Sequence, residues 1–176
     1  MKILISPAKS LDFENNVETS QSSKPIFGEK AIEINDIIKD ISSPDLGELM
    51  SISPKLSDLN WKRNQEFQNK DSYQKQAIYA FNGDVYDGID ISSISTDKHE
   101  KIQESVRILS GLYGILKPFD IIKPYRLEMG TKLSVNGSKN LYDFWSKSVT
   151  NSITEEVSDN ELIINLGSNE YFSVIN

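Results

Sequence analysis

Short apolar runs alternate along the chain with segments whose apolar residues recur at helical spacing. The runs over residues 2–6, 106–109 and 162–166 are continuous and bounded by polar or turn residues, which is typical of buried strands. Residues 29–41 carry isoleucines at close to helical spacing, which predicts an amphipathic helix. Helices that alternate with short buried strands predict a mixed α/β (α+β) fold, in one compact domain over residues 1–176.

Other segments are predicted from turn residues, helix starts and apolar spacing. Further helices are expected over residues 44–50, 54–70, 73–79, 97–106 and 141–157. In the helix that Ser53 and Pro54 open, we expect the core-facing side chains to be Leu56, Leu59, Trp61 and Phe67. We expect an exposed loop over 15–24, a turn leading into a short helix over 111–116, an extended stretch over 121–127 and a hairpin turn over 135–138.

The cysteine and histidine content excludes several classes of chemistry. The chain has 176 residues, no cysteine and one histidine, His99, which we expect to be a solvated helix residue. Disulfides, iron–sulfur clusters, zinc ribbons, thiol peroxidases and most histidine-based triads are therefore excluded. No apolar run approaches the roughly 20 residues of a membrane span, and Pro7 and Lys9 interrupt the start too early for a signal peptide. We expect a cytoplasmic protein without a metal site or cofactor.

Positive charge is concentrated in one part of an acidic chain. The formal net charge is -7, which is not what whole-chain charge predicts for a nucleic-acid-binding protein. Residues 107–132 nevertheless contain five basic residues (Arg107, Lys117, Lys123, Arg126 and Lys132) and two acidic ones (Asp120 and Glu128), a local charge of +3. This stretch is the candidate for contact with phosphates.

Two glycines, Gly111 and Gly114, lie near the start of that basic stretch. A turn over 109–114 that leads into a helix would expose backbone N–H groups to an anion, and nearby lysine and arginine would add phosphate contacts. Tyrosines could stack on unpaired bases. The predicted DNA-binding residues are Ser110, Gly111, Tyr113, Gly114, Lys117, Lys123 and Arg126. The alternative is a crossing of the core by a strand, a turn and a helix.

Polar residues that follow predicted strands or turns form a second candidate site. Because α/β proteins collect ligand groups at the carboxyl ends of their strands, an active site is expected from Lys9, Asp84, Arg126 and Glu170. The alternatives are a solvated lysine, an acidic turn between helices and a structural ion pair. Asp84 and Asp87 alone are a weak signal for a metal, since hard cations need more ligands.

Six motifs in order along the chain resemble the peroxide stress protein YaaA family. They are Met1–Leu11, Ala80–Gly88, Ser110–Pro118, Pro124–Gly130, Leu141–Trp145 and Asn165–Tyr171. The resemblance implies a cytosolic bacterial protein that limits oxidative damage, above all to DNA, with lowered free iron. It also implies an α/β fold with a basic cleft for duplex or branched DNA and a helix-hairpin-helix element, which we map onto Ser110–Pro118.

The chain departs from the family pattern in two places. It has Lys117 where many relatives have arginine, so the charge remains but bidentate phosphate geometry is lost. The family also continues into a basic segment beyond residue 176, so we expect the C-terminal part of the family to be missing here.

Three functional hypotheses follow. The first is a monomeric protein that binds the DNA backbone without sequence preference and has no catalytic activity. The second is an enzyme that acts on a nucleic acid or nucleotide through Lys9, Asp84, Arg126 and Glu170. The third, direct iron sequestration, ranks last, because the sequence lacks a Glu-x-x-His pair.

Overall fold

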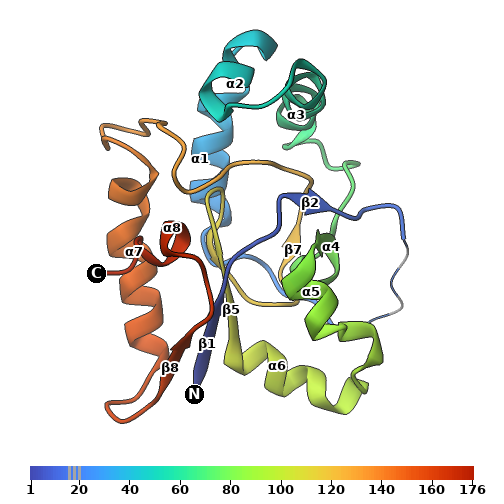
Figure 1. Cartoon of the computed structure of the whole chain (residues 1–176), viewed down its shortest axis with the longest axis vertical. Helices are drawn as coiled ribbons and strands as arrows, with labels where there is room; N and C mark the ends of the chain where they lie inside the picture. The colour runs from blue at the N-terminus through green and yellow to red at the C-terminus, as the bar shows by residue number, and fades with distance from the viewer. Residues whose placement is uncertain (16, 18, 20) are drawn as a thin grey trace.

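A four-stranded sheet lies at the centre of the fold in the computed structural model, which describes residues 1–15, 17, 19 and 21–176 (Figure 1). Its strand order is β6-β5-β1-β8, with bounds Gly114–Leu116, Val106–Ser110, Lys2–Ile5 and Ile163–Asn165. Strand β1 pairs in parallel with β5 and β8, and β5 pairs antiparallel with β6. The carboxyl ends of β1, β5 and β8 therefore meet at one edge of the sheet.

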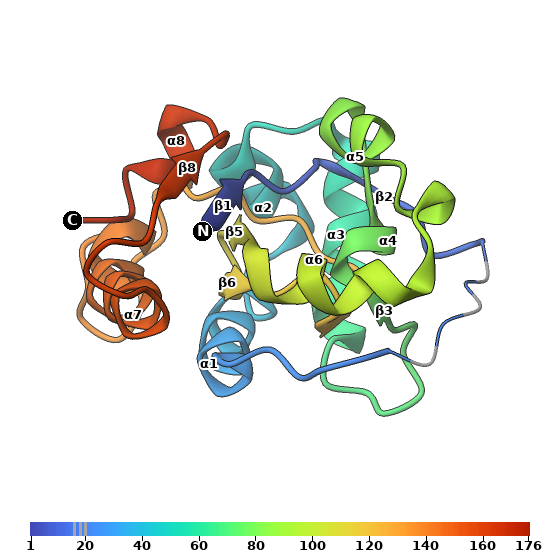
Figure 2. The same ribbon diagram turned by 90° about the horizontal axis from the view of Figure 1, so that it is seen from below.

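The remaining elements surround this sheet. Two small antiparallel sheets join β2 (Ser10–Leu11) to β4 (Phe81–Asn82) and β3 (Lys75–Gln76) to β7 (Ile121–Ile122). The α-helices are α1 (Gly28–Ile38), α2 (Ser43–Met50), α3 (Pro54–Glu66), α4 (Ala77–Ala80), α5 (Asp84–Ile89), α6 (His99–Ser105), α7 (Leu141–Glu156) and α8 (Asn169–Phe172), with 3-10 helices η1 (Ile91–Ser93) and η2 (Thr96–Lys98). Helices α6 and α7 lie on opposite sides of the sheet (Figure 2), and α2 and α3 lie beyond the carboxyl ends of β1 and β5 (Figure 1). The mixed α/β fold is confirmed.

Side-chain caps start several helices where polar residues predicted them. Ser53 precedes α3, and its hydroxyl accepts a hydrogen bond from the Leu56 amide at 3.4 Å. Asn140 caps α7 by accepting from the Asp143 amide at 3.0 Å. At the predicted hairpin turn, Val135 bridges Ser138, with Asn136 and Gly137 both at positive φ, as a two-residue hairpin turn requires. These local features follow directly from residue type.

The predicted core face of α3 is wrong at three of its four residues, and Phe67 alone of the four is buried as expected. Leu56, Leu59 and Trp61 are exposed, and the helix buries polar side chains instead: Ser57, Asn60 and Asn64. The Ser57 hydroxyl donates to the carbonyl of Ser43, and the Asn60 Nδ2 donates to the carbonyl of Leu56 at 2.8 Å. Asn64 accepts from the Asn35 amide through its backbone carbonyl at 3.1 Å, while its own side-chain Nδ2 has no partner among the described residues. Close contact with α2 and α1 therefore selects small and amide side chains, and the apolar face is left to solvent.

Three other expectations from the sequence are wrong. Residues 73–79 form β3 and the start of α4 rather than one helix, because β3 pairs with β7. Strand β8 was expected to be buried, but it pairs on one side only and its Ile163 is exposed. His99 is buried, with its ring 5.0 Å from that of Phe119 and its Nε2 3.2 Å from the Ile94 carbonyl oxygen. Tertiary packing decides each of these cases.

The segment 111–116 forms the turn of a β-hairpin and β6, not a turn into a helix. Ser110 pairs with Gly114 across the hairpin, and Gly114 has φ +71°. The expected helix-hairpin-helix element is therefore not formed over residues 110–118. Two helices joined by a short turn occur instead at α2 and α3, which are separated by three residues and pack together.

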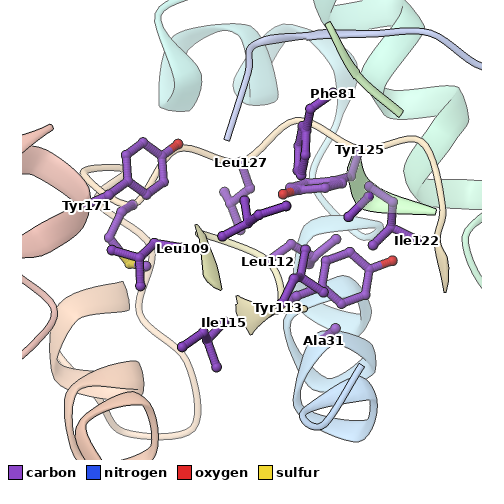
Figure 3. Packing of buried hydrophobic residues seen from close by; sticks show 14 of the residues in the cluster. Ala31, Phe81, Leu109, Leu112, Tyr113, Ile115, Ile122, Tyr125, Leu127 and Tyr171 are labelled. Carbon is purple, nitrogen blue, oxygen red and sulfur yellow. The ribbon is translucent and has the colours of Figure 1, made fainter. Parts of the chain in front are cut away.

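The hairpin lies inside the core (Figure 3). Trp145 of α7 is fully buried and donates from Nε1 to the Gly111 carbonyl at 2.9 Å. Tyr113 and Tyr125 meet edge to face, with ring centroids 5.4 Å apart. This contact brings the hairpin against the chain that follows β7.

Two further observations bear on the predictions from sequence. Within the described part of the chain, no helix is long and apolar enough to cross a membrane. The loop expected over residues 15–24 includes residues 16, 18 and 20, which lie outside the described residues.

Candidate functional site

The carboxyl edge of the sheet brings together residues that are distant in sequence. Lys9 follows β1, and Glu170 begins the short helix α8 after β8. The two chain segments are joined directly, because the Ser168 amide donates to the Ser6 hydroxyl at 2.9 Å. Parallel pairing of β1 with β8 therefore places the Lys9 loop beside the Glu170 loop, as the position of these residues after strands predicts.

A third segment, residues 124–131, crosses the same edge and supplies the central carboxylate. Glu128 accepts from Arg126 through Oε1 at 2.9 Å and lies 3.0 Å from the Lys9 ammonium through Oε2. Glu128 was not among the predicted site residues. Glu128 lies two residues after Arg126 in an extended segment, so both side chains lie on one face. This spacing is the signal in the sequence that could have indicated Glu128. Glu128 thus holds two of the predicted cations together.

Glu170 is oriented by the neighbouring backbone. Its Oε1 accepts from the Gly130 amide at 2.9 Å, and the Tyr142 hydroxyl donates to its backbone carbonyl at 2.9 Å. A Cβ at position 130 would lie 3.1 Å from this Oε1, so glycine leaves room for the carboxylate. Burial raises the pKa of the Tyr142 phenol, and the negative charge of Glu170 raises it further.

These residues surround a pocket that we call the edge pocket. Its volume is about 250 Å³, and it is lined by Leu49, Met50, Ser51, Arg126, Glu128, Gly130, Thr131 and Glu170. Leu49 and Met50 come from the end of α2, so one wall is apolar. Two carboxylates and a guanidinium supply the charged groups, beside Ser51, Gly130 and Thr131. Of the predicted catalytic residues, Arg126 and Glu170 line the pocket, and Lys9 lies behind Glu128.

Asp84 is not part of this pocket. It opens α5 and is exposed, and it is not among the lining residues. Gly83 packs near Ala8, where a Cβ at position 83 would lie 3.5 Å from the alanine methyl. The backbone therefore passes close to the Lys9 loop, while the Asp84 side chain stands in solvent.

A second arginine lies next to Arg126. Burial lowers the pKa of the Arg63 guanidinium, and the positive charge of Arg126 lowers it further. Within the described residues, the polar partner of Arg63 is Asn60 Oδ1 at 3.2 Å, and the buried Nε of Arg126 has no acceptor. Two like charges near each other, one with an unused donor, form a place where an anion would be stabilised.

A buried tyrosine supports the pocket from behind. Tyr171 follows Glu170 and is buried. Burial raises the pKa of its phenol strongly, with smaller contributions from Tyr125, Glu170 and Glu128. In the sequence analysis this tyrosine appears only as the last residue of the motif Asn165–Tyr171. Its neutral phenol lies within electrostatic reach of both pocket carboxylates.

The glycine-rich turn predicted to bind DNA is not at the surface. Ser110, Gly111, Tyr113 and Gly114 are all buried. The Tyr113 amide, one of the donors expected for phosphate, donates to the Ser110 hydroxyl at 3.0 Å. The hydroxyls of Ser110 and Tyr125 are 2.7 Å apart. These four residues cannot contact DNA in this fold, because the hairpin packs under α7 and the chain after β7.

The remaining predicted phosphate contacts do not form one basic strip. Lys117 borders a pocket with Arg107 and lies 3.9 Å from Glu156, while Lys123 donates to the carbonyls of Phe67 and Asn69 at 2.6 and 2.7 Å. Arg126 lines the edge pocket. Of the predicted DNA-binding residues, Arg126 alone lines the edge pocket.

The described residues offer no clear metal site. They contain no group of three or more histidine, cysteine, aspartate or glutamate side chains placed to hold a metal ion.

Comparison with known proteins gives a consistent result over the whole chain. A family model described as peroxide stress protein YaaA matches residues 1–176. A UPF0246 protein of Flavobacterium johnsoniae is 50% identical over 177 residues, covering 99% of this chain and 70% of the relative. UPF0246 proteins of Flavobacterium psychrophilum and Shewanella baltica are 51% and 46% identical, each again covering 99% of this chain and 70% of the relative. The chain therefore belongs to the peroxide stress protein YaaA family.

Proposed function

We propose that this chain carries out its peroxide-stress role by binding the DNA backbone, without sequence preference, as a monomer in the cytoplasm. Bound protein would limit oxidative damage to the DNA it covers. The peroxide-stress role itself follows from membership of the family. The associated fall in free iron is carried over from the family resemblance. The simplest explanation is that the protein itself binds iron, and direct measurement of Fe²⁺ binding to the purified protein tests it.

The observation that carries the proposal is Arg126, whose side chain lines the edge pocket and keeps its buried Nε without an acceptor among the described residues. Its positive charge also lowers the pKa of the Arg63 guanidinium. A phosphate bound by both guanidiniums would relieve this repulsion. Guanidinium groups match the geometry of phosphate oxygens.

A larger hollow lies along α3 and includes Arg63 in its lining. We call it the α3 groove; its volume is about 810 Å³, and its lining includes Lys62, Arg63 and Lys75 together with Glu14 and Glu66. Lys62 and Arg63 both lie on α3, which packs with α2 as two helices joined by three residues. A helix pair beside a groove with three cations supports backbone contact, which positions a protein on DNA without reading sequence.

The test is a salt titration of binding to a fluorescently labelled duplex, followed by anisotropy. Each phosphate contact contributes roughly 0.9 to the slope of log affinity against log salt. We expect the double variant R63Q/R126Q to reduce that slope by about 2 and to weaken binding about tenfold near 0.1 M salt. The matched control is K98Q/K101Q, which removes two exposed cations from η2 and α6. Equal losses in both double variants, or no loss in R63Q/R126Q, would overturn the proposal.

A second function is favoured by the convergence of Lys9, Arg126 and Glu170 at the edge pocket. Carboxylates beside cations at a pocket are the groups that general-base chemistry on a nucleotide or nucleic acid uses. Product analysis after incubation with single-stranded DNA, duplex DNA and nucleotides tests this, with E170Q as the inactive comparison. Absence of any product with the unchanged protein would exclude it.

A further inference from the structure

We infer that the edge pocket binds a single nucleotide unit, with the base inside the pocket and its phosphate beside Arg63 and Arg126. The inference rests on the proposed DNA binding and extends it, because it names what the pocket recognises. The nucleotide has two sources, either a free nucleotide or one unstacked from bound DNA. Both present the same chemistry to the pocket.

The walls of the pocket match the two kinds of surface that a base presents. Leu49 and Met50 at the end of α2 form an apolar wall, and the flexible, polarizable methionine side chain suits the flat face of a ring. Glu128 and Glu170 present carboxylate oxygens. Carboxylates accept hydrogen bonds from the amino groups on the edges of cytosine, adenine and guanine.

The size of the pocket limits the ligand to one unit. A volume of about 250 Å³ corresponds to roughly eight water molecules at about 30 Å³ each, and it falls just below the range of drug-sized ligand sites. One base fits this scale, and the surrounding walls leave no room for the sugar–phosphate backbones of a paired duplex. A base from duplex DNA therefore has to leave the stack before it can enter.

The position of the arginines gives the ligand its orientation. Arg126 lines the pocket and is tied to Glu128 through Nη2, while Arg63 lines the α3 groove. The charge of Arg126 acts on Arg63, so the phosphate belongs beside these two guanidiniums. Unstacking costs least for damaged or mismatched bases, so the pocket would favour these.

The experiment places 2-aminopurine, whose emission rises when it leaves the base stack, opposite a mismatch in a duplex. Emission and anisotropy are recorded together. With the unchanged protein we expect emission to rise at least threefold on binding. E170Q and M50A should cut the rise to less than half at protein concentrations where anisotropy shows the duplex to be saturated. The matched control E48Q changes an exposed glutamate of α2 outside the pocket and should preserve the rise.

A second experiment distinguishes a free nucleotide from a base that has left the stack of bound DNA. The fluorescent 2-aminopurine nucleoside monophosphate is titrated without DNA. A change in its emission that E170Q removes identifies a free nucleotide as a ligand, whereas a signal from the duplex alone identifies an unstacked base. Full duplex binding with no emission change in either arm overturns the inference and leaves DNA binding intact. Loss of duplex binding itself contradicts the proposed function, which the salt titration detects separately.

Discussion

Glycine has a different role in the hairpin over residues 106–116 and at the edge pocket. In the hairpin, a Cβ at Gly114 would lie 2.6 Å from the Trp145 ring, and the residue has φ +71°. At the edge pocket, Gly130 leaves room for the Glu170 carboxylate and donates its amide to it. The first glycine serves packing and the second serves a polar site. A glycine motif in sequence does not distinguish the two roles.

The two regions also differ in how their polar groups are used. In the hairpin, the hydroxyls of Ser110 and Tyr125 satisfy each other in the core. At the edge pocket, Arg126 keeps one buried donor without an acceptor among the described residues. Buried polar groups in a stable core are mostly paired, and among the described residues Asn64 Nδ2 on α3 shares this exception with Arg126. Variants that separate packing from binding test this comparison.

The largest effect is expected from G114A. The added methyl group collides with Trp145 and the residue must keep a positive φ, so the free energy of unfolding should fall by about 3 to 5 kcal/mol. Urea denaturation measures it. G88A is the matched control, since nothing lies within 4 Å of a Cβ there; it should change stability by no more than about 1 kcal/mol. A stable G114A that had lost DNA binding would instead restore the hairpin as a binding element.

A smaller effect is expected from Y125F. It removes the hydroxyl that pairs with Ser110, which should cost about 1 to 2 kcal/mol at pH 7. Y73F, at an exposed tyrosine, should stay within about 0.5 kcal/mol of the unchanged protein. If the two variants were equally stable, the buried hydroxyl pair would not contribute to the fold.

Y125F also changes how the free energy of unfolding depends on pH. Burial raises the pKa of the Tyr113 and Tyr125 phenols above the ordinary value of about 10. The folded state therefore holds these protons where the unfolded state has released them, so this stabilisation is complete below pH 10 and is lost as pH rises above it. Y125F has one such phenol fewer, so urea denaturation between pH 10 and 12 should show a shallower loss of stability.

The smallest effect is expected at the edge pocket from E128Q. Glu128 pairs with Lys9 and Arg126, so neutralising it leaves both cations for phosphate. Duplex binding should tighten about threefold at low salt, and the salt slope should steepen by about 1. E100Q makes the same charge change on the exposed face of α6 and should alter affinity less. Weaker duplex binding by E128Q would contradict the release of these two cations for phosphate.

Much of the candidate site followed from position after strands. Lys9 and Glu170 were predicted because each follows an apolar run, and the parallel pairing of β1 with β8 brings their loops together. Glu128 and Arg63 were not predicted. Their roles depend on how segment 124–131 and α3 approach the sheet, and no local pattern encodes that approach. Asp84 is the opposite case. Its acidic turn led to its prediction as a site residue, but its side chain is exposed to solvent.

The sequence by itself determined the elements that depend on neighbouring residues. The cap at Ser53, the turn at Asn136 and Gly137 and the strands β1 and β5 all follow from local conformational preferences and apolar runs. The tertiary structure alone decided that the 111–116 turn pairs β5 with β6, that α3 buries asparagines and that Glu128 joins two cations. These outcomes depend on contacts between segments far apart in the chain, because burial and charge pairing are properties of the assembled core and not of any local sequence.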